Sequence, residues 1–378
     1  MEKKKVILGL SGGVDSSVAV KVLQAQGYLV EGMFMRNWDS ATNNDVLGNP
    51  DLNEDVCPQE KDYNDALHVA NECGIKLHRI DFIDEYWENV FGYFLNEYKK
   101  GRTPNPDIMC NKYIKFDSFL KEAKKLGADY IAMGHYARVK HYPDHSLLLR
   151  GVDNNKDQTY FLCMLKQDQI KDALFPIGDL TKPQVREIAE KENLYTKNKK
   201  DSTGICFIGE RNFKGFLQNY LPAQPGNMVL LDGTVVSKHD GLMYYTIGQR
   251  KGLGIGGSHD YNNDPWFVIG KDLEKNELIV GQGFDNPYVY SNNCICEDVN
   301  WIYDKAVEGK EYTAKFRYRQ ADVPVTIKYL EDGNIRVFYP SKVRAVTPGQ
   351  ACVIYDGEVC MGGSIIASVY YDDERRKY

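Results

Sequence analysis

A glycine- and serine-rich stretch follows the first apolar segment of the chain. Val6 to Leu10 is typical of a β-strand, and Ser11-Gly12-Gly13-Val14-Asp15-Ser16-Ser17 comes directly after it. Glycines let backbone amides approach an anion, serine hydroxyls add donors, and the N-terminus of a following helix adds positive potential. The stretch lacks the Gly-Lys-Ser/Thr of a Walker A loop. We therefore predict a loop that grips a leaving pyrophosphate, with Asp15 holding Mg²⁺ or orienting the loop.

A cysteine with unusual neighbours, Cys110, is the first candidate nucleophile. It stands just ahead of a helix that the apolar spacing predicts from Tyr113 onward, and Lys112 and Lys115 are close in sequence. A helix N-terminus and nearby ammonium groups lower the pKa of a thiol, so we expect Cys110 to ionise easily. Asp107, three residues upstream, is a candidate general acid or base.

A second candidate, Cys206, lies in a turn-forming segment. Small residues precede it, and three lysines lie just upstream, at Lys197, Lys199 and Lys200. An electropositive, loop-borne thiol is typical of a reactive cysteine. The other thiols, such as Cys73, Cys163 and Cys352, are interpreted as buried apolar side chains. The nine cysteines are an odd number and form no C-x-x-C pair, so neither a disulfide framework nor a structural zinc site is expected.

These motifs together resemble one family. Ser-Gly-Gly-x-Asp-Ser between a strand and a helix is the signature of the ATP pyrophosphatases, which adenylate a carbonyl oxygen and release pyrophosphate. Asn-Pro-Asp-x-x-Cys-Asn around Cys110, and Asp-Ser-Thr-Gly-Ile-Cys-Phe-Ile-Gly around Cys206, are similar to the tRNA-specific 2-thiouridylases, which modify the wobble uridine. The resemblance covers essentially the whole chain. Further motifs that carry it are Gly32–Met35, Gly134–Arg138, Lys156–Leu162, Tyr245–Gly254, Arg317–Gln320 and Thr347–Gln350.

The resemblance also implies roles for individual residues. ATP would be held by residues 9–16 and by two residues farther along the chain, namely Gly9, Leu10, Ser11, Gly12, Gly13, Val14, Asp15, Ser16, Met35 and Gly134. The target base would be contacted by Asn105, Pro106 and Asp107. The tRNA would be contacted by His135, Lys156, Asp157, Gln158, Tyr318, Arg319 and Gln350. Cys110 would be the nucleophile and Cys206 the persulfide carrier.

The reaction implied is ATP-dependent 2-thiolation of the wobble uridine in the tRNAs for lysine, glutamate and glutamine. The C2 oxygen is adenylated, and sulfur then arrives from a Cys206 persulfide, leaving a transient Cys110–Cys206 disulfide. The persulfide sulfur either attacks directly or is first released by Cys110, and a labile iron–sulfur cluster on Asp107, Cys110 and Cys206 remains an alternative. Expected partners are the tRNA anticodon stem-loop and a sulfur donor such as a cysteine desulfurase or relay protein.

Two other classes of function account for part of the sequence. Another ATP pyrophosphatase, such as a different tRNA thiolase or an amide-forming synthetase, would share the loop, but a synthetase has no use for two reactive cysteines. A non-catalytic RNA-binding module leaves the Ser11–Ser17 loop unexplained. Pyrophosphate release from ATP separates the enzymes from the binding module.

The charge of the chain bears on its partners. A net charge of −6 argues mildly against nucleic acid, but basic clusters at Lys99–Arg102, Lys197–Lys200, Arg317–Arg319 and Lys342–Arg344 offer local positive potential. We predict that Phe316 to Gln320 is a strand whose two arginines share one face and grip phosphates.

The sequence shows neither a leader peptide nor an apolar run long enough to span a bilayer, so a cytoplasmic location is expected.

The pattern of apolar residues predicts three domains. Alternating strands and helices over residues 1–211 predict a doubly wound α/β domain with a parallel sheet. Residues 212–287 are expected to form a small mainly-β domain and residues 288–378 a β-barrel-like domain, because Asp232-Gly233, Asp332-Gly333 and Asp356-Gly357 mark hairpins. Gly252–Gly257 matches G-x-G-x-x-G, but no helix follows, so a dinucleotide site is rejected. Residues 38–58 are expected to be a mobile surface loop.

Overall fold

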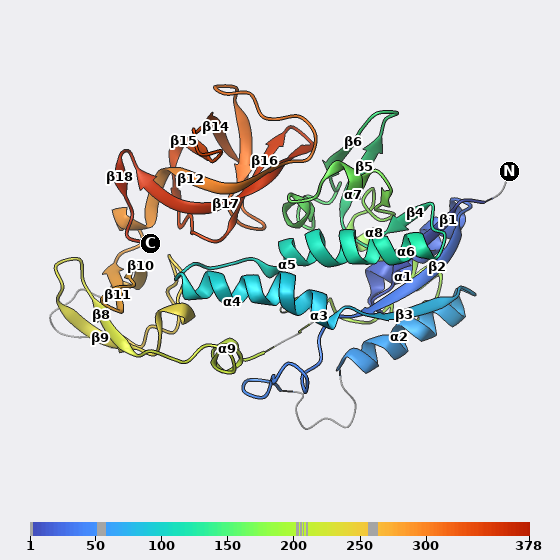
Figure 1. Ribbon diagram of the computed structural model, residues 1–378, viewed down its shortest axis with the longest axis horizontal. Helices are drawn as coiled ribbons and strands as arrows, with labels where there is room; N and C mark the ends of the chain where they lie inside the picture. The colour runs from blue at the N-terminus through green and yellow to red at the C-terminus, as the bar shows by residue number, and fades with distance from the viewer. Residues whose placement is uncertain are drawn as a thin grey trace.

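The computed structural model describes residues 3–50, 58–201, 204, 206, 208, 211–255 and 264–378. Three sheets follow one another along the chain, as Figure 1 shows from blue to red. The first is a five-stranded parallel sheet, the second a four-stranded sheet, and the third closes into a barrel. The predicted fold class, an α/β domain followed by two β-rich domains, is confirmed.

The first sheet has the strand order β3-β2-β1-β4-β7, with every pair parallel. Side chains of β1 alternate between two cores: Ile7 belongs to one, and Val6 and Leu8 belong to the other. Helices therefore cover both faces, as the doubly wound prediction required. The strands are β1 (Lys5–Gly9), β2 (Leu29–Arg36), β3 (Leu77–Asp81), β4 (Tyr130–Ala132) and β7 (Ala173–Leu174).

The helices of this part belong to two groups. The core that contains Val6 also contains residues of α1, α2 and α8, whereas the core that contains Ile7 holds the helices between β3 and β4. The first group is α1 (Val14–Ala25), α2 (Pro58–Glu72) and α8 (Lys182–Lys191). The second is α3 (Ile83–Tyr86), η1 (Trp87–Phe91), α4 (Gly92–Lys99), α5 (Pro106–Met109), η2 (Cys110–Ser118) and α6 (Phe119–Lys125). Shorter helices are η3 (Thr159–Leu162), α7 (Gln167–Ile170) and α9 (Phe213–Gln218).

The helix around Cys110 begins earlier than predicted. Asn105 caps it by accepting a hydrogen bond from the Asp107 amide, and Pro106 occupies its first position. Both are favoured helix-start residues, so the helix starts at Pro106 and not near Tyr113. It runs through the π-helical η2 without a break, because Cys110 itself has helical backbone angles. Cys110 is therefore inside the helix rather than ahead of it.

The central sheet has the order β10-β11-β8-β9, in which β8 and β11 are parallel and the other pairs antiparallel. Its strands are β8 (Gly226–Val229), β9 (Val235–His239), β10 (Trp266–Asp272) and β11 (Glu277–Gln282). The predicted Asp232-Gly233 turn joins β8 to β9, and Gly233 has a φ of 89°. The short helices η4 (Leu242–Tyr244) and η5 (Pro287–Val289) flank β10 and β11.

The C-terminal barrel closes because β12 pairs with both β15 and β17. Its strands are β12 (Tyr290–Trp301), β13 (Tyr312–Lys315), β14 (Val323–Tyr329), β15 (Ile335–Arg344), β16 (Ala351–Asp356) and β17 (Val359–Tyr371), followed by β18 (Glu374–Arg375). The other two Asp-Gly turns join β14 to β15 and β16 to β17, as predicted. A hairpin from the first part, β5 (Ala137–His141) and β6 (Ser146–Arg150), joins this sheet where Leu149 pairs with Val359.

Two local predictions are wrong. Residues 316–320 form a turn after β13 and not a strand, and Arg319 has a φ of 63°. The two arginines therefore do not share a sheet face. The prediction of a surface loop at residues 38–58 is wrong for Trp38, Asn43 and Asp45, which are buried, Trp38 beside aromatic rings of the core. Residues 51–57 of that segment and Gly256–Gly257 lie outside the described residues.

No helix in the described ranges is long and apolar enough to cross a membrane.

Candidate active site

A cavity of about 810 Å³ brings the predicted motifs together. One wall is the Ser11–Ser16 loop, and another is the helix that carries Asp107, Asn111 and Lys115. These three residues recur every four positions, so they share one helix face. The remaining walls come from the end of β4, from the segment around Cys206, and from the turn at Tyr318 and Arg319 of the barrel.

The glycine- and serine-rich loop joins β1 to α1. Gly12 has a φ of 73°, and a Cβ there would lie 2.5 Å from the Asp62 carbonyl oxygen, so only glycine fits. The Ser16 and Ser17 hydroxyls donate to the Gly13 carbonyl at 3.1 and 2.8 Å. The N-cap residue of α1, Gly13, has no side chain with which to cap the helix, so the first amides of α1 remain available to an anion. This loop therefore fits the phosphates of a nucleotide.

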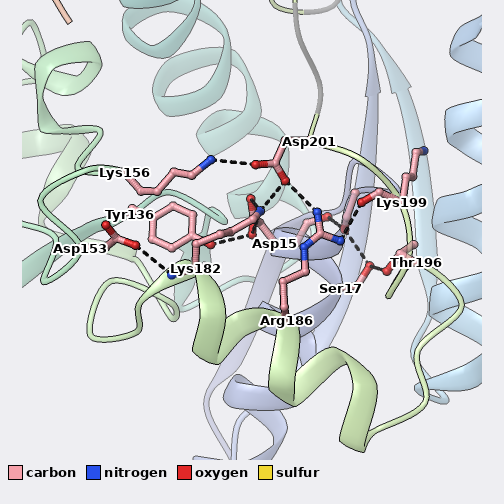
Figure 2. Close-up of polar contacts among 12 residues, drawn as sticks. Asp15, Ser17, Tyr136, Asp153, Lys156, Lys182, Arg186, Thr196, Lys199 and Asp201 are labelled. Atoms are coloured by element: carbon pink, nitrogen blue, oxygen red, sulfur yellow. Dashed lines mark hydrogen bonds and ion pairs between the residues drawn. The ribbon is translucent and has the colours of Figure 1, made fainter. Parts of the chain in front are cut away.

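Asp15 of this loop is held by a lysine from a distant helix. Lys182, at the start of α8, places its Nζ 2.8 and 2.9 Å from the two carboxylate oxygens of Asp15, and the Tyr136 hydroxyl donates to Asp15 at 2.8 Å. Figure 2 shows Lys182 between Asp15 and Asp201. The predicted Mg²⁺ contact of Asp15 would have to share the carboxylate with this ammonium group.

Asp201 joins the cysteine-bearing segment to the loop. It accepts from Lys156 at 2.7 Å and from Arg186 at 3.0 Å, and its contact with Lys182 is 2.7 Å. Partial burial raises its pKa, but the bonds from Lys156 and Lys182 outweigh that cost, so the pKa of Asp201 is lowered. Asp201, five residues before Cys206, is thereby held beside the loop, as Figure 2 shows.

The two candidate cysteines meet at the cavity. The Sγ atoms of Cys110 and Cys206 are 3.9 Å apart, with Cys110 donating. Cys110 is fully buried, whereas Cys206 is partly exposed and lines the cavity. The Cys206 amide donates to the Asp107 carboxylate at 3.3 Å, and the Tyr86 hydroxyl donates to the Cys206 carbonyl at 2.8 Å. Tertiary structure thus places the two thiols in contact and the Asp107 carboxylate against the Cys206 backbone.

The pKa shifts of this group differ from the expectation for Cys110. Burial and the neighbouring Cys206 raise the pKa of Cys110, so it is the protonated partner. The hydrogen bond from Cys110, followed by the charge of Lys115, lowers the pKa of Cys206 against the opposing effect of burial. Burial also lowers the pKa of Lys115, but Cys206, Cys110 and Asp107 raise it further, so Lys115 stays charged. The prediction of an easily ionised Cys110 is therefore wrong for the free enzyme, because that thiol is desolvated and faces a second sulfur.

The geometry agrees with comparisons made along the whole chain. Models described as the tRNA methyl transferase HUP domain, the tRNA methyl transferase PRC-barrel domain and the aminomethyltransferase beta-barrel domain match residues 4–210, 214–282 and 291–366. The chain is 60% identical over 376 residues to the tRNA-specific 2-thiouridylase MnmA of Acholeplasma laidlawii, with all of both chains covered. It is 57% identical to that of Mesoplasma florum, covering 96% of this chain and 99% of the relative. This chain belongs to the tRNA-specific 2-thiouridylase family.

Several residues that the family resemblance assigned to tRNA make hydrogen bonds within this 2-thiouridylase-family chain. Asp157 is buried and accepts from the Gly151 amide and the Thr159 hydroxyl. Gln158 accepts from the Tyr136 amide at 3.0 Å, and Gln350 donates to the Thr103 carbonyl at 2.7 Å. His135 lines the cavity, and burial, with a smaller effect from Lys115, lowers its pKa, so its ring is neutral.

The other assigned residues of this family member lie at the cavity or beside it. Tyr318 packs on Phe161 with ring centroids 4.4 Å apart, and Arg319 lies over the Tyr318 ring. Met35 and Gly134 line the cavity, and a Cβ at Gly134 would lie 3.1 Å from the Ser16 amide. Asn105 and Pro106 form the start of the helix that carries Asp107.

Sequence reasoning missed Lys182 and Asn111 as members of this site. Lys182 is far from the loop in sequence, and no local signal links it to Asp15. Asn111 could have been found, since it follows Asp107 at helical spacing once the helix start at Pro106 is recognised. Among the described residues, no group of three His, Cys, Asp or Glu side chains is placed to hold a metal ion.

Proposed function

We propose that this chain catalyses the ATP-dependent 2-thiolation of the wobble uridine in the tRNAs for lysine, glutamate and glutamine. One observation carries the proposal: two thiols 3.9 Å apart border a cavity whose other wall is a phosphate-binding loop. Relatives that share 55–60% of their residues with this chain bear the name tRNA-specific 2-thiouridylase.

ATP, bound with Mg²⁺ at the Ser11–Ser16 loop, supplies the AMP that makes the C2 oxygen of uridine a leaving group. Amides at the N-terminus of α1, with Lys182 close by, stabilise the departing pyrophosphate. The base enters beside Asn105, Pro106 and Asp107, and the anticodon stem-loop lies against the rim that includes Lys156, Tyr318 and Arg319. Asp107, whose pKa burial raises, accepts or returns the proton.

Cys206 receives the sulfur. Its lowered pKa makes it a nucleophile toward the terminal sulfur of a persulfide donor, such as a cysteine desulfurase or relay protein, and Cys206 then carries that sulfur as its own persulfide. The terminal sulfur reaches C2 either directly or after Cys110 attacks the inner sulfur. In both routes one Cys110–Cys206 bond forms, AMP leaves, and a thiol reductant must supply two electrons before the next cycle. The 3.9 Å separation favours this route over an iron–sulfur cluster.

Two measurements test the function. Purified protein with ATP and tRNA is expected to release pyrophosphate and to form 2-thiouridine, detected by mass spectrometry of tRNA nucleosides. Cys110→Ser and Cys206→Ser should each abolish 2-thiouridine while ATP still binds, because neither thiol belongs to the phosphate loop. Phosphate in place of pyrophosphate would count against the proposal, and residual 2-thiouridine in either variant would remove that cysteine from the mechanism.

A further inference from the structure

The cavity contains a buried amide whose hydrogen bonds are only half satisfied. Asn111 is 2% exposed and lines the cavity. Its Nδ2 donates to the Asp107 carbonyl at 2.9 Å and to the Phe161 carbonyl at 3.2 Å. Its Oδ1 is buried and has no hydrogen-bond partner among the described residues.

The orientation of this amide is unambiguous. An amide nitrogen has two hydrogens, and both are used on carbonyl oxygens that can only accept. Turning the amide over would place Oδ1 against those two oxygens, so the oxygen must remain on the side without a partner. A buried acceptor left unpaired costs free energy, and that cost is recovered when a bound ligand supplies a donor.

Asn111 is also close to the reacting groups. It lies one helical turn after Asp107, whose carboxylate is bonded to the Cys206 amide, and one turn before Lys115, which lowers the Cys206 pKa. In uracil, the N3–H group is a single donor bonded directly to C2, the carbon that takes sulfur. Cytosine has a lone pair at N3, which an amide oxygen repels.

We propose that Asn111 reads the target base by accepting a hydrogen bond from uracil N3–H. This inference rests on the proposed function and deepens it, because it names a residue that distinguishes uridine from cytidine. The carbonyl groups of Asp107 and Phe161 hold the amide in place. The base supplies the hydrogen-bond donor that its oxygen lacks.

A substitution in the enzyme and a change in the substrate, made separately and together, test this role. The substrates are two ligated tRNAs that carry uridine or 3-deazauridine at the target position, since 3-deazauridine has C–H where uridine has N3–H. For the unaltered enzyme, we expect kcat/KM for thiolation to fall about 10- to 100-fold on 3-deazauridine. For Asn111→Ala, we expect a similar fall on uridine and less than a threefold difference between the two substrates.

Gln169 provides a matched control. Its Nε2 donates to the Lys112 and Phe116 carbonyls of the same helix at 2.8 and 3.2 Å, but its Oε1 is already satisfied by the Lys166 amide. Gln169→Ala should disturb the helix and keep the full uridine preference. Asn111→Ser, which retains a short donor toward the Asp107 carbonyl, gives a second variant if Asn111→Ala folds poorly.

Each result of this experiment leads to a different conclusion about Asn111. An Asn111→Ala enzyme that retains the uridine preference of the unaltered enzyme would overturn the inference, because a merely structural residue slows both substrates equally. An unaltered enzyme that thiolates neither tRNA would overturn the proposed function, and this inference with it. A preference lost in the Asn111 variants and kept in Gln169→Ala is the expected result.

Discussion

The sulfur atoms of Cys110 and Cys206 behave as one unit. Cys110 donates to Cys206, and Lys115 adds positive charge beside both. The partly exposed sulfur, which an incoming donor can reach, is therefore the more acidic of the two, while burial and the neighbouring sulfur raise the pKa of the Cys110 thiol. Once Cys206 carries an extra sulfur, Asp107 is the nearby carboxylate able to accept the Cys110 proton.

The difference in pKa and exposure between the two thiols predicts that they react with an alkylating reagent at different rates. Cys206 should be alkylated by iodoacetamide at neutral pH at least tenfold faster than Cys110, because only the thiolate reacts and only Cys206 is accessible. Cys110→Ala removes the hydrogen bond that stabilises the thiolate, so the pH midpoint of Cys206 alkylation should rise. Peptide mapping by mass spectrometry across pH measures both effects. Faster labelling of Cys110 would contradict the assignment of the charge.

At the scale of elements, the helix α8 supplies a cation that the phosphate loop lacks. Thr181 caps α8, and the Lys182 amide donates to Asp153 at 2.9 Å, so the helix start is fixed in place. Lys182 then neutralises Asp15 at the mouth of the loop.

Replacing this lysine should weaken nucleotide binding. In Lys182→Met, the Asp15 carboxylate loses its cation and repels the triphosphate, so we expect the Kd for ATP, measured by calorimetry, to rise about tenfold. Arg186→Met is the control, since Arg186 also bonds Asp201 but does not contact Asp15. Equal losses in the two variants would argue that the effect comes from Asp201 instead.

A short strap, residues 101–105 between α4 and α5, connects the segment proposed to bind the base to the other two domains. The Thr103 amide donates to the Pro348 carbonyl at 2.9 Å, and Gln350 donates to the Thr103 carbonyl. A Cβ on Gly349 would lie 2.9 Å from the Thr103 amide, so this close approach requires glycine. The barrel therefore helps to set where Asn105 and Asp107 lie.

This contact gives Gln350 a role that can be told apart from tRNA binding. If Gln350 positions the strap, Gln350→Ala should lower kcat for thiolation about tenfold with little change in KM for tRNA. Arg319→Ala, at an exposed rim residue, should raise KM instead. Steady-state kinetics with tRNA as the varied substrate decide the matter, and a pure KM effect in Gln350→Ala would favour direct tRNA contact.

At the scale of the whole molecule, a buried lysine joins the central sheet to the strap. Lys271 of β10 is 7% exposed, and its Nζ donates to the Gly101 carbonyl at 2.9 Å. Burial lowers its pKa from 10.5 to about 8. The unfolded chain therefore binds more protons than the folded chain between pH 8 and 10.5, and stability from this group rises with pH across that window.

Lys271→Met should remove this dependence, because methionine does not titrate. Below pH 8 the folded protein bears the full cost of a buried ammonium, at most about 3 kcal/mol for this shift, and methionine removes it. The Tm of Lys271→Met relative to the unaltered protein should thus be highest near pH 7 and fall steadily toward pH 10. Thermal melts across this range measure the difference. A constant difference would show that Lys271 does not titrate as its burial implies.

The sequence by itself determined the features that depend on neighbouring residues. The Ser11–Ser17 loop was recognisable because its glycines and the following helix are local, and the Asp-Gly hairpins were recognisable because two-residue turns dictate pairing of adjacent strands. The predicted strand at Phe316–Gln320 was wrong because a tertiary turn overrides alternation in so short a segment. The helix start at Pro106 was missed although Asn105 and Pro106 signal it.

Only the tertiary structure decided which distant groups meet. Cys110 and Cys206 come into contact because the helix after Pro106 and the segment after Asp201 border the same cavity, and no spacing in the sequence expresses that. The same holds for Lys182 with Asp15 and for Gln350 with Thr103. Charge and pKa follow from these contacts, since desolvation and the nearest opposite charge are properties of the folded chain. Sequence therefore marked out the candidate residues, and folding determined which of the two thiols is the more acidic and which buried amide oxygen lacks a partner among the described residues.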